Sequence, residues 1–279
     1  MANYTAADIK ALRERTGAGM LDVKKALDEA DGNADKALEI IRVKGLKGVS
    51  KREGRSASDG LVAAHVGDDA TGQTGVLIEL NCETDFVAKN VTFVALAEKV
   101  LASAVTAGTD DVAAILATEV DGRTVQETID ETAATLGEKV VLRRVARVSA
   151  EKVAVYLHKV NKDLPPQVGV LVGTDAAGAP VGKDIAMHVA AYSPTYLTRD
   201  EVPTETVESE RRIAEETSRN EGKPEAALPK IIEGRLNGFF KESVLVDQAF
   251  AKDPKKSVAK VLSEVGGTAT GFARFRVGA

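Results

Sequence analysis

The sequence predicts a mixed α+β protein whose helices and strands occur in separate blocks along the chain. Three short helical segments fill about the first 45 residues, an order of strand, loop, strand and helix then occurs twice, and a polar helical hairpin follows. Such blocks are typical of α+β folds. We therefore expect an N-terminal three-helix module, a core of two similar α/β subdomains with antiparallel sheets, and a protruding antiparallel coiled-coil hairpin.

Length and composition are those of a folded protein with more than one domain. The chain has 279 residues, of which 44% are hydrophobic and 28% are charged, near the averages for globular proteins. This length suggests two or three domains. The predicted boundaries are residues 1–56 for the N-terminal module with a basic linker, 57–148 for a core N-subdomain, 149–198 with 241–279 for a core C-subdomain, and 199–240 for the helical hairpin.

Several observations bear on where the chain works. No apolar stretch approaches the ~20 residues of a membrane span, and the N-terminus has neither an apolar signal core nor an Arg-rich transit pattern. We therefore expect a cytoplasmic protein without membrane contact. The one cysteine, Cys82, excludes an internal disulfide. A net charge of -5 argues against extensive contact with phosphate backbones, so no stable nucleic-acid binding is expected.

The first block predicts a small helical bundle. Thr5 and Asp8 form a capping-box-like start, with Asp in place of the usual Glu. A second helix is predicted over residues 20–30, and a third follows with Ala37 and Ile41 on one face. The bundle resembles a ubiquitin-associated-type fold, which is a binding module, and its own core is thin.

A predicted linker follows the bundle over residues 45–60. This segment is rich in Gly, Ser, Lys and Arg and poor in large apolar residues, so we expect a flexible tether. Two interpretations of its basic residues stay open, a solvated tether or a contact with an acidic partner or RNA. The basic residues are Lys47, Lys51, Arg52 and Arg55.

The core pattern occurs twice. Residues 61–66 and 75–80 predict an antiparallel hairpin that is followed by a helix with Phe93, Ala97 and Val100 on one face. Residues 153–160, 168–172 and 185–191 repeat this order, and the run GVLI at residue 75 matches GVLV at residue 169. The match predicts two similar half-domains. Between them we expect a helix that ends at Gly137 and a strand over residues 140–148.

The last part of the chain predicts a polar helical hairpin and a return to the core. The first arm, over residues 204–219, is crowded with Glu and Arg and offers Val207, Ile213 and Ala214 as its apolar seam. Because a helix this polar cannot be buried on all sides, we expect the hairpin to protrude from the core. Ser257 then caps a helix, and residues 271–277 alternate as a closing strand.

The junction NCETDFVAKN over residues 81–90 is the strongest candidate for a functional segment. It connects a predicted buried strand to a predicted helix, and such connections lie at the surface and often carry function. It also places an acid, Asp85, beside a bulky apolar residue, Phe86. Two interpretations stay open. Phe86 and Val87 pack into the local core while Asp85 caps a helix, or Phe86 is a wedge that inserts into a partner.

Signals for enzyme chemistry are weak. His65, His158 and His188 are far apart and lack the spacing of metal ligands. The segment over residues 178–184 imitates a phosphate-binding loop but has too few residues before Gly-Lys and lacks the hydroxyl that would bind Mg²⁺. We therefore expect a protein that is not an enzyme, uses no cofactor or metal, and acts through its surfaces.

Several blocks in a fixed order carry a family resemblance. They are LRERTGAGM at residues 12–20 with Asp22 and KKAL at 24–27, TDFVAK at 84–89, GEK at 137–139 with RRVA at 143–146, IAMH at 185–188, and EGKP at 221–224 with EGR at 233–235. With these blocks the chain resembles the elongation factor Ts family, the guanine nucleotide exchange factors of bacterial translation. The resemblance implies that the partner is elongation factor Tu, in GDP-bound and nucleotide-free states.

The resemblance also implies three groups of partner-binding residues. The residues expected to enter the partner's GTPase domain and dislocate its Mg²⁺ are Thr84, Asp85, Phe86 and Val87. Those expected to dock the N-terminal module are Arg13, Met20 and Lys24. Those expected on core surfaces of the complex are Leu136, Gly137 and His158. For His158 a structural interpretation stays open, because beside Tyr156 in an alternating strand it could simply be a rim residue.

Other interpretations remain beside the exchange factor. One is a ribosome- or RNA-associated binding module without exchange activity, which would use the basic linker and the helical hairpin. Another is an enzyme with an unrecognised site. The stoichiometry also stays open, with a homodimer or a dimer of heterodimers among the alternatives.

Overall fold

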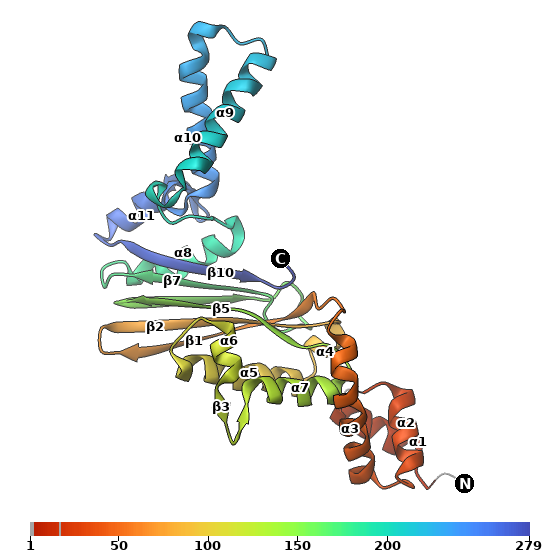
Figure 1. Cartoon of the computed structure of the whole chain (residues 1–279). Coiled ribbons are helices and arrows are strands. Elements are labelled where there is room, and N and C mark those ends of the chain that lie inside the picture. Colours follow the sequence, from red (N-terminus) through yellow and green to blue (C-terminus); the bar gives the residue numbers. More distant parts are fainter. Residues whose placement is uncertain (1–2, 17) are drawn as a thin grey trace.

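The computed structural model describes residues 3–16 and 18–279, apart from the side chains of residues 46, 47 and 49–51. The chain is elongated, with three helices at one end, two layers of sheet with helices outside them in the middle, and a helical hairpin that projects from the other end (Figure 1). The predicted α+β class is confirmed. Within the described part of the chain, no helix is long and apolar enough to cross a membrane.

The N-terminal bundle consists of α1 (Ala6–Thr16), α2 (Met20–Glu29) and α3 (Ala34–Arg52). The predicted start of α1 is confirmed, because the Thr5 amide donates to Asp8 Oδ2 at 2.7 Å and the Asp8 amide donates to Thr5 Oγ1 at 3.3 Å. The bundle has its own small core, and its similarity to ubiquitin-associated folds stays a prediction. The buried core residues are Leu12, Ala18, Val23, Ala26, Leu27, Ala30, Ala37 and Ile41.

The flexible linker predicted over residues 45–60 is wrong for its first half, because α3 continues to Arg52. Gly45 explains the continuation. A Cβ at Gly45 would lie 2.0 Å from the carbonyl oxygen of Ala134, so the missing side chain lets α3 pack directly on α7 (Val125–Leu136). The Arg52 guanidinium also donates to the Ala133 carbonyl at 3.4 Å. Tertiary packing therefore overrides the weak helix propensity of this glycine-rich segment.

The N-terminal half of the core is an antiparallel sheet covered by helices. The strands β1 (Asp59–Asp69), β2 (Gly72–Cys82) and β5 (Val141–Ala150) have the order β1-β2-β5. The helices α5 (Val91–Ala107), α6 (Val112–Ala117) and α7 cover one face of this sheet (Figure 1). The predicted apolar face of α5 is confirmed by the burial of Phe93, Ala97 and Val100. A short hairpin of β3 (Glu119–Val120) and β4 (Arg123–Thr124) was not predicted.

The C-terminal half repeats this arrangement. The strands β6 (Lys152–His158), β7 (Val168–Thr174) and β10 (Ala269–Arg276) form an antiparallel sheet with the order β10-β7-β6. The helix α8 (Ala179–Tyr192) packs on its outer face. The predicted cap of α11 (Val258–Glu264) is confirmed, because Ser257 Oγ accepts from the Lys260 amide. The small strands β8 (Ala249–Phe250) and β9 (Asp253–Ser257) precede α11.

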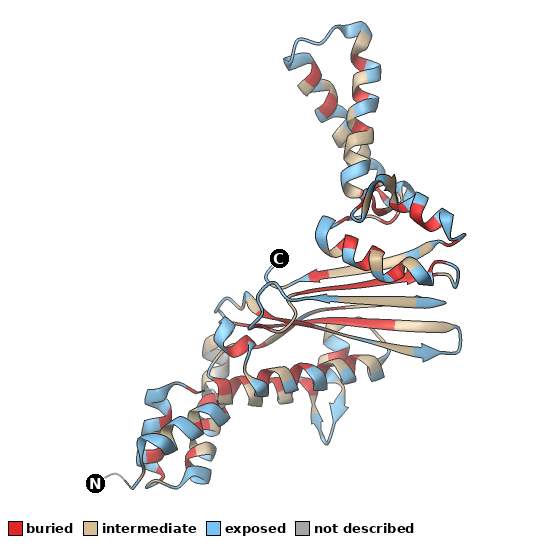
Figure 2. Cartoon of the chain, turned by 180° about the vertical axis from the view of Figure 1, so that it is seen from behind, coloured by how far each residue is buried: buried red, intermediate tan, exposed pale blue. Residues whose placement is uncertain are grey.

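The two sheets pack face to face, so the repeat seen in the sequence becomes a two-layer core (Figures 1 and 2). The glycines that align in the repeat lie where the layers approach. A Cβ at Gly169 would lie 2.6 Å from Leu77 Cδ1, and a Cβ at Gly75 would lie 2.8 Å from Val153 Cγ1. The predicted domain boundaries stay predictions. The buried residues between the sheets are Val62, Leu77, Val148, Leu171 and Phe275.

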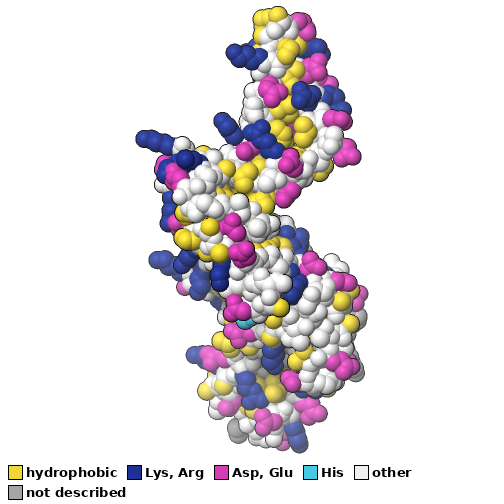
Figure 3. Space-filling view, turned by 90° about the vertical axis from the view of Figure 1, so that its left-hand side faces the viewer, with side chains coloured by type: hydrophobic (Ala, Val, Ile, Leu, Met, Phe, Trp, Pro, Cys, Tyr) yellow, Lys and Arg dark blue, Asp and Glu magenta, His cyan; other side chains and the backbone are white. Residues whose placement is uncertain are grey.

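The projecting hairpin is formed by α9 (Thr204–Asn220) and α10 (Leu228–Ser243). Charged side chains surround an apolar stripe along it (Figure 3). The expectation that Ile213 lies in the seam is wrong, because 51% of Ile213 is exposed while Ala214 and Ser218 are buried. Ala214 and Ser218 are one helical turn apart and therefore share a face, whereas Ile213 is rotated by about 100° from Ala214.

Candidate partner-binding site

The junction between β2 and α5 folds into a one-turn helix, α4 (Asp85–Ala88). The predicted strand-to-helix connection is thus confirmed, but the residue that caps α4 is Thr84, not Asp85. Thr84 Oγ1 accepts from the Val87 amide at 3.4 Å. Asp85 is the first helical residue, where its charge is favourable for the helix dipole. Asn90 then caps α5 by accepting from the Thr92 amide at 2.8 Å.

The short helix separates two neighbouring apolar residues. Val87 and Ala88 are 2% and 0% exposed, whereas 49% of Phe86 is exposed. Asp85 is exposed as well. The interpretation that both Phe86 and Val87 pack into the local core therefore holds for Val87 and is wrong for Phe86. Because the buried face of α4 anchors it on the sheet, the opposite face presents a carboxylate and an aromatic ring to solvent.

The N-terminal bundle contacts this exposed ring. The Arg13 guanidinium carbon lies 5.3 Å from the centre of the Phe86 ring, and Lys89 Nζ lies 5.7 Å from it. Both distances are within the range of cation–π interaction. Of the residues predicted for the N-terminal module, the structure brings Arg13 to Phe86. Met20 is 59% exposed and Lys24 is exposed, so both present their side chains to solvent on α2.

Two glutamates, Glu83 and Glu138, tie this turn to the segment that follows α7, and we call them the glutamate clasp. Glu138 Oε2 accepts from the amides of Glu83 at 3.1 Å and Thr84 at 3.0 Å. Glu138 Oε1 accepts from the Thr84 hydroxyl at 2.6 Å. In return, Glu83 Oε1 accepts from the Lys139 amide at 2.7 Å. Burial raises the pKa of Glu138, and its hydrogen bonds from Thr84 oppose this rise.

The segment after α3 is attached to the same place. Lys139 Nζ donates to the carbonyl oxygens of Glu53 and, at 3.1 Å, of Arg55. The Arg55 guanidinium lies 3.3 Å from the Glu83 carboxylate. Arg52 and Arg55, two of the basic residues considered for an RNA contact, are thus engaged within the chain. The side chains of Lys47 and Lys51 lie outside the described residues.

The residues predicted for the core surfaces have different positions. Leu136 is 3% exposed on the inner face of α7, and its contribution to a core surface of the complex stays a prediction. Gly137 ends α7 with a φ of 81° and is exposed. Gly137 also borders a cavity of about 320 Å³, together with Gly19 and Asp22 of the N-terminal bundle.

His158 lies on the other sheet but at the same end of the core. It is exposed at the end of β6, and its Nδ1 is 3.0 Å from the Tyr156 hydroxyl. The next turn leads to Pro166, whose carbonyl accepts from the Val62 amide near the start of β1. The start of β1 pairs with the end of β2, where the junction begins. His158 therefore lies at this end of the core without recorded contact to Phe86.

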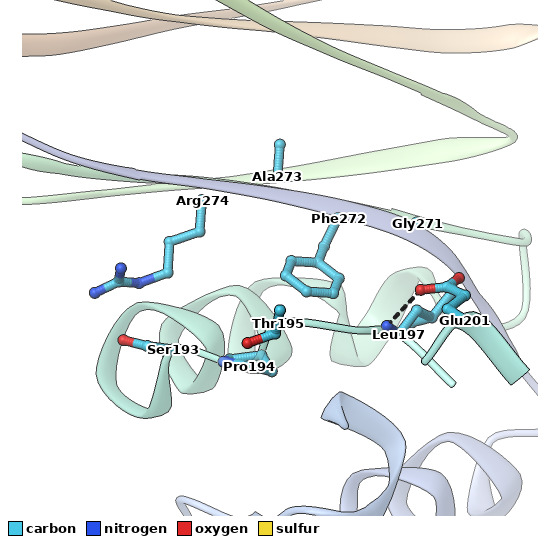
Figure 4. A pocket seen from close by; sticks show the side chains of 9 residues that line it. All are labelled: Ser193, Pro194, Thr195, Leu197, Glu201, Gly271, Phe272, Ala273 and Arg274. Atoms are coloured by element: carbon cyan, nitrogen blue, oxygen red, sulfur yellow. Dashed lines mark hydrogen bonds between the residues drawn. The ribbon is translucent and has the colours of Figure 1, made fainter. Parts of the chain in front are cut away.

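A separate cavity of about 390 Å³ lies between β10 and the segment after α8 (Figure 4). Two of its polar side chains have partners within the chain, since an Arg274 Nη donates to the Ala190 carbonyl at 3.3 Å and Glu201 accepts from the Leu197 amide at 2.7 Å, while Arg274 Nε is buried without a hydrogen-bond partner. It contains none of the predicted site residues. The arrangement around Phe86 instead combines an exposed ring, flanking cations and a hydrogen-bonded polar frame, and aromatic and Arg side chains are enriched in protein–protein interfaces.

The glutamate clasp is not predicted by the sequence patterns. Glu138 lies in the block GEK at residues 137–139, which indicates no role for its carboxylate. One signal was available, because Glu83 and Thr84 directly precede a short helix, whose first amides lack partners within the helix and favour an acid as acceptor. The pairing of the two acids, 55 residues apart, is visible only in the fold.

Comparisons with known proteins give a consistent result. Residues 83–279 match the family model described as Elongation factor TS. The chain is 72% identical to a protein of Beutenbergia cavernae, 66% identical to one of Micrococcus luteus and 58% identical to one of Kineococcus radiotolerans, all named Elongation factor Ts. Each comparison covers 100% of this chain and 100% of the relative.

Proposed function

Because the chain belongs to the elongation factor Ts family, we propose that it is a guanine nucleotide exchange factor for elongation factor Tu. In this proposal it binds the partner, disturbs its Mg²⁺ and phosphate site, and promotes GDP release so that GTP can bind during translation elongation. The protein itself makes and breaks no covalent bond, so it needs no catalytic residue and no cofactor.

One observation carries the proposal, namely the exposed ring of Phe86 on an anchored turn. Aromatic residues are enriched where the binding energy of protein interfaces is concentrated. Phe86 is 49% exposed, and its neighbours Val87 and Ala88 fix the turn on the core. The ring is thus available to a partner without local unfolding of this chain.

The physical mechanism is a displacement of the elements that hold the partner's Mg²⁺. This ion requires near-ideal octahedral oxygen geometry, so a small shift of its ligands or waters is costly. Burial of an apolar side chain stabilises a bound state by about 1.5–3 kcal/mol when the side chain is fully exposed beforehand. Because only 49% of Phe86 is exposed, its burial in the nucleotide-poor conformation of the partner alone would stabilise that conformation by about half of this amount.

Asp85 adds an electrostatic contribution. It is adjacent to Phe86 and exposed, so it would approach the same phosphate and Mg²⁺ region of the partner. A carboxylate there repels phosphate oxygens and competes for the metal. Arg13, which lies against the ring, would dock the N-terminal bundle on the same partner domain. Apolar and charged groups therefore act together on the nucleotide site.

Thermodynamic linkage completes the exchange cycle. If binding of this protein weakens nucleotide binding by some factor, nucleotide must weaken binding of this protein by the same factor. Rebinding of GTP or GDP would then release the factor from its partner. The protein would accelerate exchange in both directions and would not change the equilibrium between the two nucleotides.

The test is stopped-flow release of a fluorescent GDP from purified elongation factor Tu at fixed Mg²⁺, with and without this protein. We expect a large acceleration that saturates with the concentration of the factor. Absence of acceleration with a folded protein that still binds the partner would refute the exchange function.

A further inference from the structure

We infer that Glu138 is a positioning residue, which holds the turn of residues 84–87 in the orientation that presents Phe86. The inference deepens the proposed exchange function and rests on it for its kinetic consequence. Its geometric part concerns this chain alone. Glu138 follows Gly137 at the end of α7, and its carboxylate accepts three hydrogen bonds from Glu83 and Thr84.

The three bonds fix the N-terminal end of the turn. Two backbone amides, those of Glu83 and Thr84, point at one carboxylate oxygen, at 3.1 and 3.0 Å. The Thr84 hydroxyl donates to the other oxygen at 2.6 Å while it accepts from the Val87 amide at 3.4 Å. A chain of hydrogen bonds therefore runs from Glu138 through Thr84 to Val87. Because the hydroxyl proton is given to Glu138, the lone pairs of Oγ1 are left to cap α4.

The turn does not hold this geometry by itself. A helix of four residues has almost no intrinsic stability, because nucleation of a helix is unfavourable. Its N-terminal amides also lack partners within the helix. The acceptor for the amides of Glu83 and Thr84 is Glu138, which lies directly after the C-cap of α7, a twelve-residue helix packed on the core. Glu83 returns the contact by accepting from Lys139 at 2.7 Å, so the two segments are fixed to each other in both directions.

This fixation has a kinetic consequence for exchange. A ring that is already oriented in the free protein binds without an ordering cost. Loss of Glu138 would leave the ring present but mobile, whereas the other contact surfaces would stay intact. We therefore expect the maximal rate of GDP release to fall, while the concentration of factor that gives half of this rate changes little.

Two variants of Glu138 grade the effect. Glu138→Ala removes all three acceptor bonds, and Glu138→Gln keeps one acceptor oxygen for the two amides but no longer accepts the Thr84 hydroxyl proton. The maximal rate of GDP release should therefore be highest for wild type, lower for Glu138→Gln and lowest for Glu138→Ala. If the alanine variant does not fold, as judged by circular dichroism and thermal unfolding, the glutamine variant decides the test.

The chain offers a closely matched control on the same helix. Glu127 near the start of α7 accepts from the Thr124 amide at 2.8 Å and from the Thr124 hydroxyl at 3.1 Å. Glu127→Ala and Glu127→Gln thus remove the same kinds of bond from the other end of α7. They should lower stability, by less than the Glu138 variants because Glu127 accepts two such bonds and is exposed, and leave the maximal release rate unchanged.

The first measurement is amide hydrogen exchange in the free protein. In Glu138→Ala we expect exchange at Glu83 and Thr84 to accelerate by about tenfold to a hundredfold, as for the loss of a hydrogen bond to a charged group, with little change elsewhere. The second measurement is the concentration dependence of GDP release. There we expect a drop of about tenfold in the maximal rate and a change below about threefold in the half-saturating concentration.

Each outcome decides the inference. If wild type accelerates release and Glu138→Ala matches it, the positioning role is refuted. If wild type does not accelerate release, the exchange function fails independently, and hydrogen exchange then decides the geometric part. In that case, unchanged protection of the Glu83 and Thr84 amides in Glu138→Ala refutes the positioning of the turn by Glu138. Accelerated amide exchange that is confined to residues 83–88 in this variant supports it.

Discussion

Replacement of Phe86 by alanine is the most direct test of the proposed surface. A Phe→Ala change at a fully packed site costs about 3–5 kcal/mol. In the free protein 49% of Phe86 is exposed, so about half of this cost applies to the step that buries the ring against a partner. The expected loss is therefore about 2 kcal/mol, which corresponds to a decrease of about thirtyfold in the acceleration of GDP release.

The assay is the stopped-flow release of fluorescent GDP from elongation factor Tu. Phe86→Leu keeps an apolar side chain but loses the ring over which Arg13 lies. The acceleration of GDP release by this variant should therefore lie between that of Phe86→Ala and that of wild type. Val120→Ala is a control, since Val120 is an apolar residue with 41% exposure on the β3–β4 hairpin. Unchanged release with Phe86→Ala, at wild-type stability and saturating factor, would refute the role of this ring.

Three further predictions concern the fold that supports the site. Gly45→Ala places a Cβ 2.0 Å from the Ala134 carbonyl, so chemical denaturation should report a loss of about 1–3 kcal/mol and easier proteolysis after α3. Arg144→Met removes the guanidinium 2.6 Å from the fully buried carboxylate of Glu79; unfolding free energies should fall by about 3 kcal/mol, with partial recovery when Glu79→Gln is added. His188 is buried, accepts from the Ala251 amide and bonds Gln248, and burial lowers its pKa. The unfolded chain therefore takes up a proton below about pH 6.5 while the folded chain does not. Thermal midpoints should fall as the pH drops below that value, and this slope should be reduced in His188→Asn.

Apolar periodicity and capping residues in the sequence correctly predicted the helices that pack along their length against a core. The face of α5, the cap at Ser257 and the start of α1 at Thr5 were all readable, because capping and burial in these places depend on residues within one or two helical turns. The match of Gly75 with Gly169 also predicted the repeated halves. It did so because the close approach of two sheets leaves no room for side chains at these positions.

The site itself was readable in part. The junction of strand and helix was predicted from a change of periodicity, and Phe86 was recognised as unusual for such a position. Sequence left open whether Phe86 packs into the core together with Val87 or is exposed as a wedge, because both residues are apolar and adjacent. The rotation of α4 about its axis decides this, and that rotation depends on the hydrogen bonds from Thr84 to Glu138.

What the sequence by itself determined was the α+β class, the order of the main helices and strands and the strand-to-helix junction that forms the candidate site. Tertiary structure alone decided the extension of α3 past Gly45, the exclusion of Ile213 from the hairpin seam and the pairing of Glu83 with the segment after α7. The physical reason is the range of the interactions. Helix caps and apolar periodicity act between neighbours in the chain, whereas backbone clearance and the alignment of a carboxylate with two amides depend on segments that only folding brings together.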